Sequence, residues 1–302
     1  MNFKAVEEYE GLRLDSFLAQ MVPDLSRTKI QNRIKEGKIL VNGSILKPSY
    51  TIKENDLVSI DNEAFKEECL PLPPENIPLE TVWEDENMAV INKPSGMLTH
   101  PTTIERSGTL VNALLYKYGE NLSDINGDYR RGIVHRLDRN TSGLIMVAKN
   151  NKTHEFLVEE MRGKCFVKKY LAVVKGVIEK ESFEIDTPIG RHLTQPHKQA
   201  INGKDAKDAI THVKVLERYK DATLVELTLI TGRTHQIRVH MASIGHPVYN
   251  DTLYGFGKMK IKTEEQVLQS YKLEFTKPFS EERVSLEIEP DEKIKKVLNA
   301  LR

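Results

Sequence analysis

Apolar residues near the N-terminus recur at helical spacing and then give way to short apolar runs. Residues 14–21 carry them three and four positions apart, and residues 27–36 repeat the spacing behind Ser26, the expected N-cap. Apolar runs follow at 39–41, directly before an Asn-Gly turn signal, and at 57–60. The pattern predicts two short helices and a small hairpin sheet.

The pattern changes between residues 61 and 79. The first half of this stretch is acidic and weakly patterned and the second half is rich in proline, which is typical of an extended interdomain segment. We therefore expect an N-terminal domain over 1–62, a linker over 63–79 and a larger domain over 80–302. In the larger domain the spacing predicts strands over 81–93, 167–175, 213–216 and 223–229, and helices over 109–116 and 153–161.

A polar loop between two apolar runs is the strongest candidate for chemistry. The runs at 133–134 and 144–148 predict that two strands hold the loop. Asp138 lies within it, and the neighbouring Arg136 and Arg139 are expected to keep its carboxylate ionised and to lower its pKa. The alternative is an Asx-type turn, in which the Asp138 side chain only bonds the backbone.

Composition limits the function classes. The chain has 302 residues, of which 39% are hydrophobic, and its formal net charge is zero. Without a global basic field, contact with nucleic acid has to come from local basic patches. The two cysteines are far apart in sequence, and no apolar run approaches a membrane span. We expect a cytoplasmic protein with no membrane segment and no disulfide framework.

One local basic patch falls on the second predicted helix and its exit. It contains Arg27, Lys29, Arg33 and Lys38, although charge runs are also common on solvated helix faces. Leu-Asp-x-Phe-Leu, followed by Ser-Arg-x-x-Ile-x-x-x-Ile-x-x-Gly-x-Ile-x-Val-Asn-Gly, resembles the S4 RNA-binding domain over residues 12–60. The resemblance implies that these four basic residues contact RNA phosphates, which position the protein without reading sequence.

The polar loop reads His-Arg-Leu-Asp-x-x-Thr-Ser-Gly over residues 135–143. This string resembles the catalytic loop of the RluA-type RNA pseudouridine synthases. The resemblance implies that Asp138 is the catalytic carboxylate, that Arg136 enters the space left by an extruded base, and that His135 belongs to the RNA-binding residues. Extrusion is expected because a stacked uridine does not present C1′ to a carboxylate.

Two later motifs resemble the same family. In Lys-x-Tyr-x-Ala over 168–172, the resemblance places Tyr170 against the target base, where its hydroxyl helps to remove the C5 proton. Without that context Tyr170 reads as a core aromatic residue. In Thr-Gly-Arg-x-His-Gln-Ile-Arg-Val-His over 231–240, the resemblance implies that Arg238 pairs with Asp138 and that Ile237 walls the pocket.

The last motif also contains His235 and His240. Five positions separate them, which puts them on opposite faces of a strand and places them poorly on a helix for a shared metal, and no nearby cysteine or acid completes a metal-binding set. We therefore expect no zinc site. Two positions depart from the family pattern, because Asn250 stands where glycine is usual and Lys277 where histidine is usual.

The resemblance covers nearly the whole chain and implies an α+β fold. A small S4-type RNA-binding domain is followed by a larger pseudouridine-synthase catalytic domain with a mixed, largely antiparallel sheet. The implied activity is isomerisation of uridine in RNA to pseudouridine, which conserves all atoms and needs no metal or other cofactor. The domain order resembles the D-type synthases of large-subunit (23S) ribosomal RNA, so we expect a monomer acting on ribosomal RNA, with tRNA as the alternative substrate.

Three questions stay open at this point. Asp138 could attack C1′ as a nucleophile or remove a sugar proton. A non-catalytic S4-type ribosome-assembly factor is a rival, although it would have no use for Asp138, Tyr170 and Arg238 together. An N-glycosidase is the other rival, but it would need a second carboxylate to place water, and the matched motifs supply none.

Overall fold

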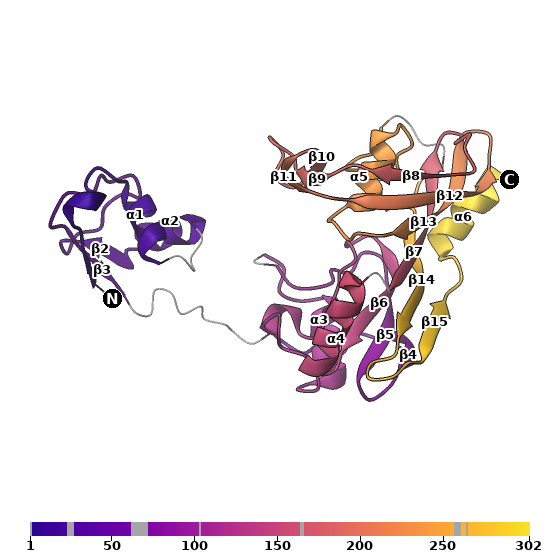
Figure 1. Ribbon diagram of the computed structural model, residues 1–302, viewed down its shortest axis with the longest axis horizontal. Helices are drawn as coiled ribbons and strands as arrows, with labels where there is room; N and C mark the ends of the chain where they lie inside the picture. The colour runs from indigo at the N-terminus through magenta and orange to yellow at the C-terminus, as the bar shows by residue number, and fades with distance from the viewer. Residues whose placement is uncertain are drawn as a thin grey trace. The chain divides into compact units, whose positions relative to one another are not determined.

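Two units with separate hydrophobic cores make up the protein. The structure, a computed structural model, describes residues 2–22, 27–61, 72–102, 104–163, 166–256, 261–263 and 265–302. The chain divides into Met1–Pro71 and Leu72–Arg302 (Figure 1). In the described part of the chain, no helix combines the length and the apolar content needed to cross a membrane.

The N-terminal unit packs two helices against a three-stranded antiparallel sheet. Apolar side chains from both helices and from the strands form one buried cluster. The predicted helices and strands are confirmed, whereas the expected N-cap Ser26 and the expected domain end at residue 62 lie outside the described residues. The elements are β1 (Asn2–Lys4), a short 3-10 helix (Glu7–Tyr9), α1 (Leu14–Met21), α2 (Arg27–Lys35), β2 (Ile39–Val41) and β3 (Leu57–Ile60), with sheet order β1-β3-β2.

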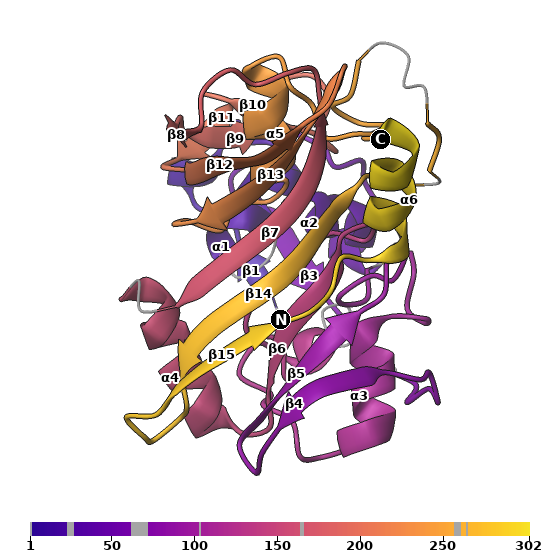
Figure 2. The same cartoon turned by 90° about the vertical axis from the view of Figure 1, so that its right-hand side faces the viewer.

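The second unit is built on a nine-stranded sheet. Its order is β4-β5-β6-β14-β7-β13-β12-β8, with β15 paired to β14 (Figure 2). Among the described pairings only β6 with β14 is parallel, so the sheet is mixed and largely antiparallel, as expected. The strands are β4 (Glu80–Glu84), β5 (Met88–Lys93), β6 (Ser142–Ala148), β7 (Val167–Lys175), β8 (Ser182–Asp186), β12 (Ile210–Arg218), β13 (Ala222–Leu229), β14 (Leu268–Thr276) and β15 (Arg283–Glu287).

Helices cover both faces of this sheet. Alternation along β7 separates the faces: Tyr170 and Ala172 join the core that contains α3 side chains, whereas Leu171 and Val173 join the core that contains α6 side chains. Figure 1 shows these two helices on opposite sides of the sheet. The remaining described elements are α3 (Leu110–Tyr118), a 3-10 helix (Asp128–Arg130), α4 (Asn151–Arg162), a small sheet of β9 (Ile189–Arg191), β10 (Gln199–Ile201) and β11 (Lys204–Lys207), α5 (Gln236–Ser243) and α6 (Glu292–Leu301).

The structure differs from the expected linker over 63–79. Residues 62–71 lie outside the described part, but residues 72–79 pack on the second unit. Leu72 is buried in its main core, and the Glu75 carboxylate accepts the N–H of Gly108 at 3.1 Å. Residues 72–79 form no helix or strand, in agreement with the proline-rich composition, but the composition did not reveal these anchoring contacts.

The first of the two strands expected around the Asp138 loop is also absent from the described ladder. Ile133 makes a single bridge to Val147, and the chain then leaves the sheet. The His135 ring lies beside β6 and its Nε2 accepts the N–H of Met146 at 3.0 Å. The His135 side chain thus accepts a backbone N–H of β6 that a longer first strand would bind. Only the strand that follows the loop, β6, is regular.

Residues 236–243 form helix α5, which decides between the strand and the helix that the sequence left open. His235 adopts φ 58°, which breaks the extended backbone at the start of the helix. The side chain of Gln236 then folds back and accepts a backbone N–H at 2.9 Å. Ile237 and Met241, four residues apart, both enter the main core, so the alternating sequence concealed a helical face.

The close approach of β14 to β6 makes a prediction about Gly143. A Cβ at this glycine, which has φ 108°, would lie 2.1 Å from the Ser270 carbonyl oxygen. We expect Gly143→Ala to lower the free energy of unfolding by about 3 kcal/mol or more, measured by denaturant titration, because the packed strands cannot separate to admit the methyl group. Gly108 has φ 71° and nothing within 4 Å of its Cβ position, so the control Gly108→Ala should lose only about 1 kcal/mol. Equal losses would contradict the steric argument.

Candidate active site

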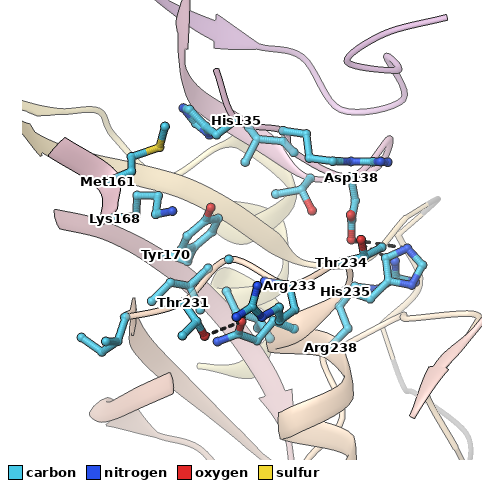
Figure 3. Close-up of a pocket in the computed structure, with 18 of the residues that line it drawn as sticks. His135, Asp138, Met161, Lys168, Tyr170, Thr231, Arg233, Thr234, His235 and Arg238 are labelled. Atoms are coloured by element: carbon cyan, nitrogen blue, oxygen red, sulfur yellow. Dashed lines mark hydrogen bonds and ion pairs between the residues drawn. The ribbon is translucent and has the colours of Figure 1, made fainter. Parts of the chain in front are cut away.

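A cavity of about 570 Å³ lies between the loop before β6, strand β7 and the segment that leads into α5. Its lining includes six residues singled out from the sequence: His135, Arg136, Asp138, Tyr170, Ile237 and Arg238. Figure 3 labels His135, Asp138, Tyr170 and Arg238. Cavities of several hundred Å³ are typical of sites for small organic ligands. The fold therefore brings three separate sequence motifs to one pocket of suitable size for a nucleotide.

Asp138 presents its carboxylate to this cavity. The Arg238 guanidinium donates a hydrogen bond from Nη1 to Asp138 Oδ2 at 3.1 Å, and the Asp138 side chain is 17% exposed. The turn itself is closed by the backbone, since the Asp138 carbonyl accepts the N–H of Thr141 at 3.1 Å. The carboxylate is thus engaged with a cation at the pocket, which distinguishes it from the side chain of a simple Asx turn.

Arg238 is held more firmly by a second carboxylate than by Asp138. Its Nε and Nη2 donate to the two oxygens of Asp251 at 2.7 and 3.0 Å, and its Cζ lies 5.1 Å from the centre of the Tyr254 ring. Burial by itself would raise the pKa of Asp251, but the hydrogen bonds and charge of Arg238 outweigh it and hold the pKa below its usual value. Asp251 therefore orients the guanidinium toward Asp138.

Sequence reasoning missed Asp251 as a site residue. The segment around it was noted only because Asn250 replaces a glycine. Asn250 adopts φ 57°, a left-handed conformation that asparagine tolerates, and its Nδ2 donates to the Ile261 carbonyl at 3.0 Å. The departure from the family pattern therefore leaves the local turn intact, and the available signal for Asp251 was an acid three residues before Tyr254 in that segment.

His235 is a second residue of the site that was not predicted as such. Its Nδ1 lies 2.8 Å from the Tyr254 hydroxyl and its Nε2 lies 3.8 Å from Asp138 Oδ2. Burial lowers the pKa of His235 below its usual value, although the charge of Asp138 opposes the shift. The ring is accordingly neutral at pH 7 and contributes hydrogen bonding without a full charge.

Tyr170 lies on β7 with its ring buried and its side chain at the cavity. Figure 3 shows Tyr170 between Lys168 on one side and the Asp138 and Arg238 pair on the other. Burial raises the pKa of Tyr170 well above its usual value, and the negative charge of Asp138 adds to the effect. The phenol is therefore protonated at neutral pH.

His135 lines the cavity but is used mainly to hold the loop. Besides accepting the Met146 N–H, its ring lies 6.1 Å from the ring of Phe166. Burial lowers the pKa of His135 to about 3, and the nearby Lys168 charge contributes. His135 is thus a neutral residue that holds the loop in place, and its expected contact with RNA stays a prediction.

The expectation that Arg136 and Arg139 hold Asp138 is not met by the described contacts. Arg139 donates to both oxygens of Glu105 at 2.7 Å, and Arg136 is an exposed residue at the cavity. The guanidinium bonded to Asp138 comes instead from α5, one hundred residues further along the chain. Being next to Asp138 in sequence did not make Arg136 and Arg139 its partners, because the loop directs their side chains away from its carboxylate.

The described residues contain no group of three or more His, Cys, Asp or Glu side chains placed to hold a metal ion. His240 is a buried core histidine. Its Nδ1 lies 2.9 Å from the Thr211 hydroxyl and its Nε2 lies 3.0 Å from the Thr187 carbonyl oxygen. Both ring nitrogens thus have hydrogen-bond partners within the protein.

Comparison with known proteins assigns this geometry to a family. The RNA pseudouridylate synthase model matches residues 87–243. An RNA pseudouridine synthase of Bacillus subtilis (strain 168) is 42% identical over 302 residues, which are 100% of this chain and 98% of the relative. The chain belongs to the RNA pseudouridylate synthase family. Ribosomal large subunit pseudouridine synthase D of Zymomonas mobilis is 38% identical over 300 residues, or 94% of this chain and 92% of that protein.

A solved structure agrees with this assignment. Human RNA Pseudouridylate Synthase Domain Containing 1 is similar with a TM-score of 0.58 and 25% identity, over 76% of this chain and 97% of that chain. The S4 domain model matches residues 12–58. The protein is therefore an RNA pseudouridine synthase with an N-terminal S4 domain, an isomerase that acts on RNA.

In this synthase the basic residues of the S4 domain have acidic neighbours. The side chain of Lys29 lies outside the described part, and the other three expected RNA contacts are each paired. The pairs of Arg33 and Lys38 are at least partly exposed and contribute only about 0–1 kcal/mol, so phosphate oxygens can replace their acids at small cost. Arg27 differs, because its partner Asp15 is buried. The pairs are Arg27–Asp15 at 2.8 Å, Arg33–Glu36 at 2.7 Å and Lys38–Asp61 at 3.8 Å.

The geometry of Arg238 makes a prediction about Asp251. Asp251→Asn removes the charge that orients the guanidinium, and we expect pseudouridine formation to slow about 10²-fold, the cost of a reacting group misplaced by ~1 Å. The rate is measured as tritium release from RNA labelled at uridine C5. Glu105→Gln, which frees Arg139 beside Asp138 but leaves Arg238 untouched, is the control and should keep the normal rate. An unimpaired Asp251→Asn protein would refute the orienting role.

Proposed function

We propose that the protein isomerises uridines of large-subunit (23S) ribosomal RNA to pseudouridine, with Asp138 as the catalytic carboxylate. The observation that carries the proposal is the Asp138 carboxylate at a nucleotide-sized cavity, bonded to Arg238 at 3.1 Å. Ribosomal RNA is supported by the relatives named ribosomal large subunit pseudouridine synthase D, with tRNA as the alternative substrate. Because one chain supplies the whole site, we propose that the protein is a monomer. We also propose that it acts in the cytoplasm.

Asp138 begins the reaction as an anion. It either attacks C1′ of the target nucleotide or removes a sugar proton, and both routes break the N1–C1′ bond and leave its electron pair on the uracil. Arg238 favours the ionised carboxylate, since a cation in a partly buried site stabilises a neighbouring negative charge. The base then turns, C5 bonds to C1′, and Asp138 is released.

Tyr170 is proposed to support the base and to assist loss of the C5 proton. Its ring presents an apolar face on which a uracil can stack. Because burial raises the pKa of Tyr170, the phenol is neutral when the reaction begins. Removal of the C5 proton through the hydroxyl therefore requires that the phenol pass its own proton onward, and the released Asp138 carboxylate is a suitable acceptor.

Arg136 and Ile237 complete the proposed pocket. Extrusion of a uridine costs a few kcal/mol of stacking and pairing. The exposed guanidinium of Arg136 is planar and can stack against the bases that remain, while the buried Ile237 side chain forms part of the cavity wall. Arg136 thus compensates for extrusion outside the pocket, and Ile237 limits the space within it.

The rival functions are disfavoured by the same cavity. Asp138 is the one carboxylate among the described residues that line it, whereas an N-glycosidase would need a second to place water. A non-catalytic assembly factor would gain nothing from a buried Arg238 bonded to two carboxylates, because burying such charges is costly. Both features favour an isomerase.

The central prediction concerns Asp138. Asp138→Asn retains the shape of the side chain but lacks the anion, so we expect tritium release from C5-labelled RNA to stop while RNA binding persists. Asp128→Asn, an exposed surface change that affects the pair with Arg131, is the matched control and should be fully active. Turnover by the Asp138→Asn protein would overturn the assignment, and release of free uracil by the unmodified protein would favour a glycosidase.

The substrate is tested in cells with the same variant. Pseudouridine is mapped across total RNA from cells with and without the protein, and after complementation with the normal or the Asp138→Asn chain. We expect one or a few sites in large-subunit ribosomal RNA to depend on the normal chain alone. Lost sites confined to tRNA would refute the ribosomal substrate but retain the isomerase.

The S4 domain makes a separate prediction. If Arg33 contacts a phosphate, Arg33→Ala should weaken RNA binding and reduce the slope of log affinity against log salt by about 1, with little change in the rate of the bound complex. Filter binding at several salt concentrations measures both quantities. Lys4→Ala, on β1, removes an equal charge from the same domain and serves as the control; equal effects would indicate a non-specific loss of charge.

A further inference from the structure

A second cation faces the cavity from the side of Tyr170. Lys168 lies on β7 two residues before Tyr170, so the two side chains emerge from the same face of the strand. Figure 3 shows Lys168 and the Asp138 and Arg238 pair on opposite sides of Tyr170. The Lys168 ammonium lies 5.5 Å from the centre of the Phe166 ring, and within the described part of the chain no carboxylate pairs with it.

The charges at the two ends of the cavity differ in how they are balanced. Arg238 is bonded to two carboxylates, Asp251 and Asp138. Lys168 is surrounded by an aromatic ring, a neutral His135 and a neutral Tyr170, and burial lowers the pKa of Lys168 to about 8. The protein thus keeps a partly desolvated positive charge in the pocket with no carboxylate counterion among the described residues.

The position of Lys168 favours a base contact over a phosphate contact. The phosphodiester of an extruded nucleotide remains at the mouth of a pocket, where the exposed side chains of Arg136 and Arg233 lie. When C1′ is next to Asp138 and the uracil extends across Tyr170, the far edge of the base points toward Lys168. That edge carries a carbonyl oxygen, which accepts a hydrogen bond.

We propose that Lys168 is a further catalytic residue, which donates a hydrogen bond to a uracil carbonyl oxygen and stabilises the negative charge that the base acquires when the N1–C1′ bond breaks. The inference rests on the proposed function. An interaction that strengthens as charge develops accelerates the reaction, in the manner of an oxyanion hole.

The electron count supports this assignment. Before reaction Asp138 carries the negative charge, and afterwards it is a C1′ ester or a protonated acid, while the N1–C1′ electron pair resides on uracil N1, O2 and O4. One unit of negative charge has moved away from Arg238. When C5 attacks C1′, that pair forms the new bond, the C5 proton leaves, N1 gains a proton, and Asp138 regains its charge.

The symmetry of uracil allows one cation to serve both halves of the reaction. Rotation by 180° about the N3–C6 line exchanges N1 with C5, and it also exchanges O4 with O2. A donor that meets O4 before the rotation therefore meets O2 after it. Gly232 lies at this end of the cavity, since a Cβ there would be in ordinary van der Waals contact with Lys168 Nζ at 3.5 Å.

The test compares Lys168→Met with Lys169→Met, its neighbour on the same strand, which pairs with Glu226 at 3.1 Å on the other face. Single-turnover rates are measured with RNA that carries uridine or 5-fluorouridine at the target, by mass spectrometry of the nucleoside consumed. Fluorine stabilises the uracil anion by withdrawing electrons. We expect Lys168→Met to slow uridine consumption about 10²-fold, with RNA affinity retained, and to impair the fluorinated substrate much less.

Further outcomes separate the explanations. Lys168→Arg, which keeps a donor cation, should recover most of the rate, and Lys169→Met should be unimpaired. A normal rate for Lys168→Met, an equal defect on both substrates, or a loss confined to RNA affinity would each overturn the inference. Misfolding lowers the amplitude of a single turnover and leaves its rate constant unchanged, so it is distinguishable. Inactivity of the unmodified protein would refute the proposed function itself.

Discussion

The site depends on one guanidinium fixed between two carboxylates. Arg238 donates two hydrogen bonds to buried Asp251 and one to Asp138. A partly buried carboxylate is ionised at little cost only when a cation lies beside it, and the cation must be directional if the carboxylate is to face a substrate. The sheet brings the cation and the two carboxylates together because β6, β14, β7 and β13 are consecutive in it. Asp138 precedes β6, Tyr170 lies on β7, Arg238 follows β13, and Asp251 precedes β14.

Fixing Arg238 would be of little use if the loop that carries Asp138 were mobile. Side chains from distant segments bind its backbone carbonyls. The Thr99 hydroxyl donates to the Leu137 carbonyl at 2.8 Å, Lys93 donates to the Arg139 carbonyl at 3.1 Å, and Lys293 of α6 donates to the Asn140 carbonyl at 3.1 Å. Burial lowers the pKa of Lys93 to about 7, while its three carbonyl acceptors favour the protonated form. The loop is therefore ordered before substrate binds, so positioning the Asp138 carboxylate costs no further conformational entropy.

The sequence correctly predicted the features that hydrophobic periodicity and short sequence motifs determine. The helices at 14–21 and 153–161, the two faces of β7 and the pairing of Arg238 with Asp138 agree with the structure. One error arose where a side chain replaced a backbone partner, because His135 accepts a backbone N–H that a longer first strand would use. The choice between strand and helix for residues 236–243 stayed open in the sequence, and the left-handed backbone of His235 decides it by starting α5. Asp251 escaped notice because its function is to bind another side chain, and such a role depends on tertiary contacts that local sequence does not encode. The catalytic roles themselves remain predictions.

The division of Arg238 between two acids also has a consequence for reactivity. If Arg238 were bound to Asp138 alone, a tight bidentate pair would stabilise the ground-state anion and would oppose transfer of its charge to the base. Asp251 occupies the strong bidentate position, so Asp138 receives a single bond that suffices to keep it charged. In the proposed mechanism, Arg238 keeps its stronger pair with Asp251 when the charge moves to the uracil, and it is not left unpaired in a buried site. Under that mechanism Asp251, which is buried behind Arg238, lowers the free-energy cost of neutralising Asp138.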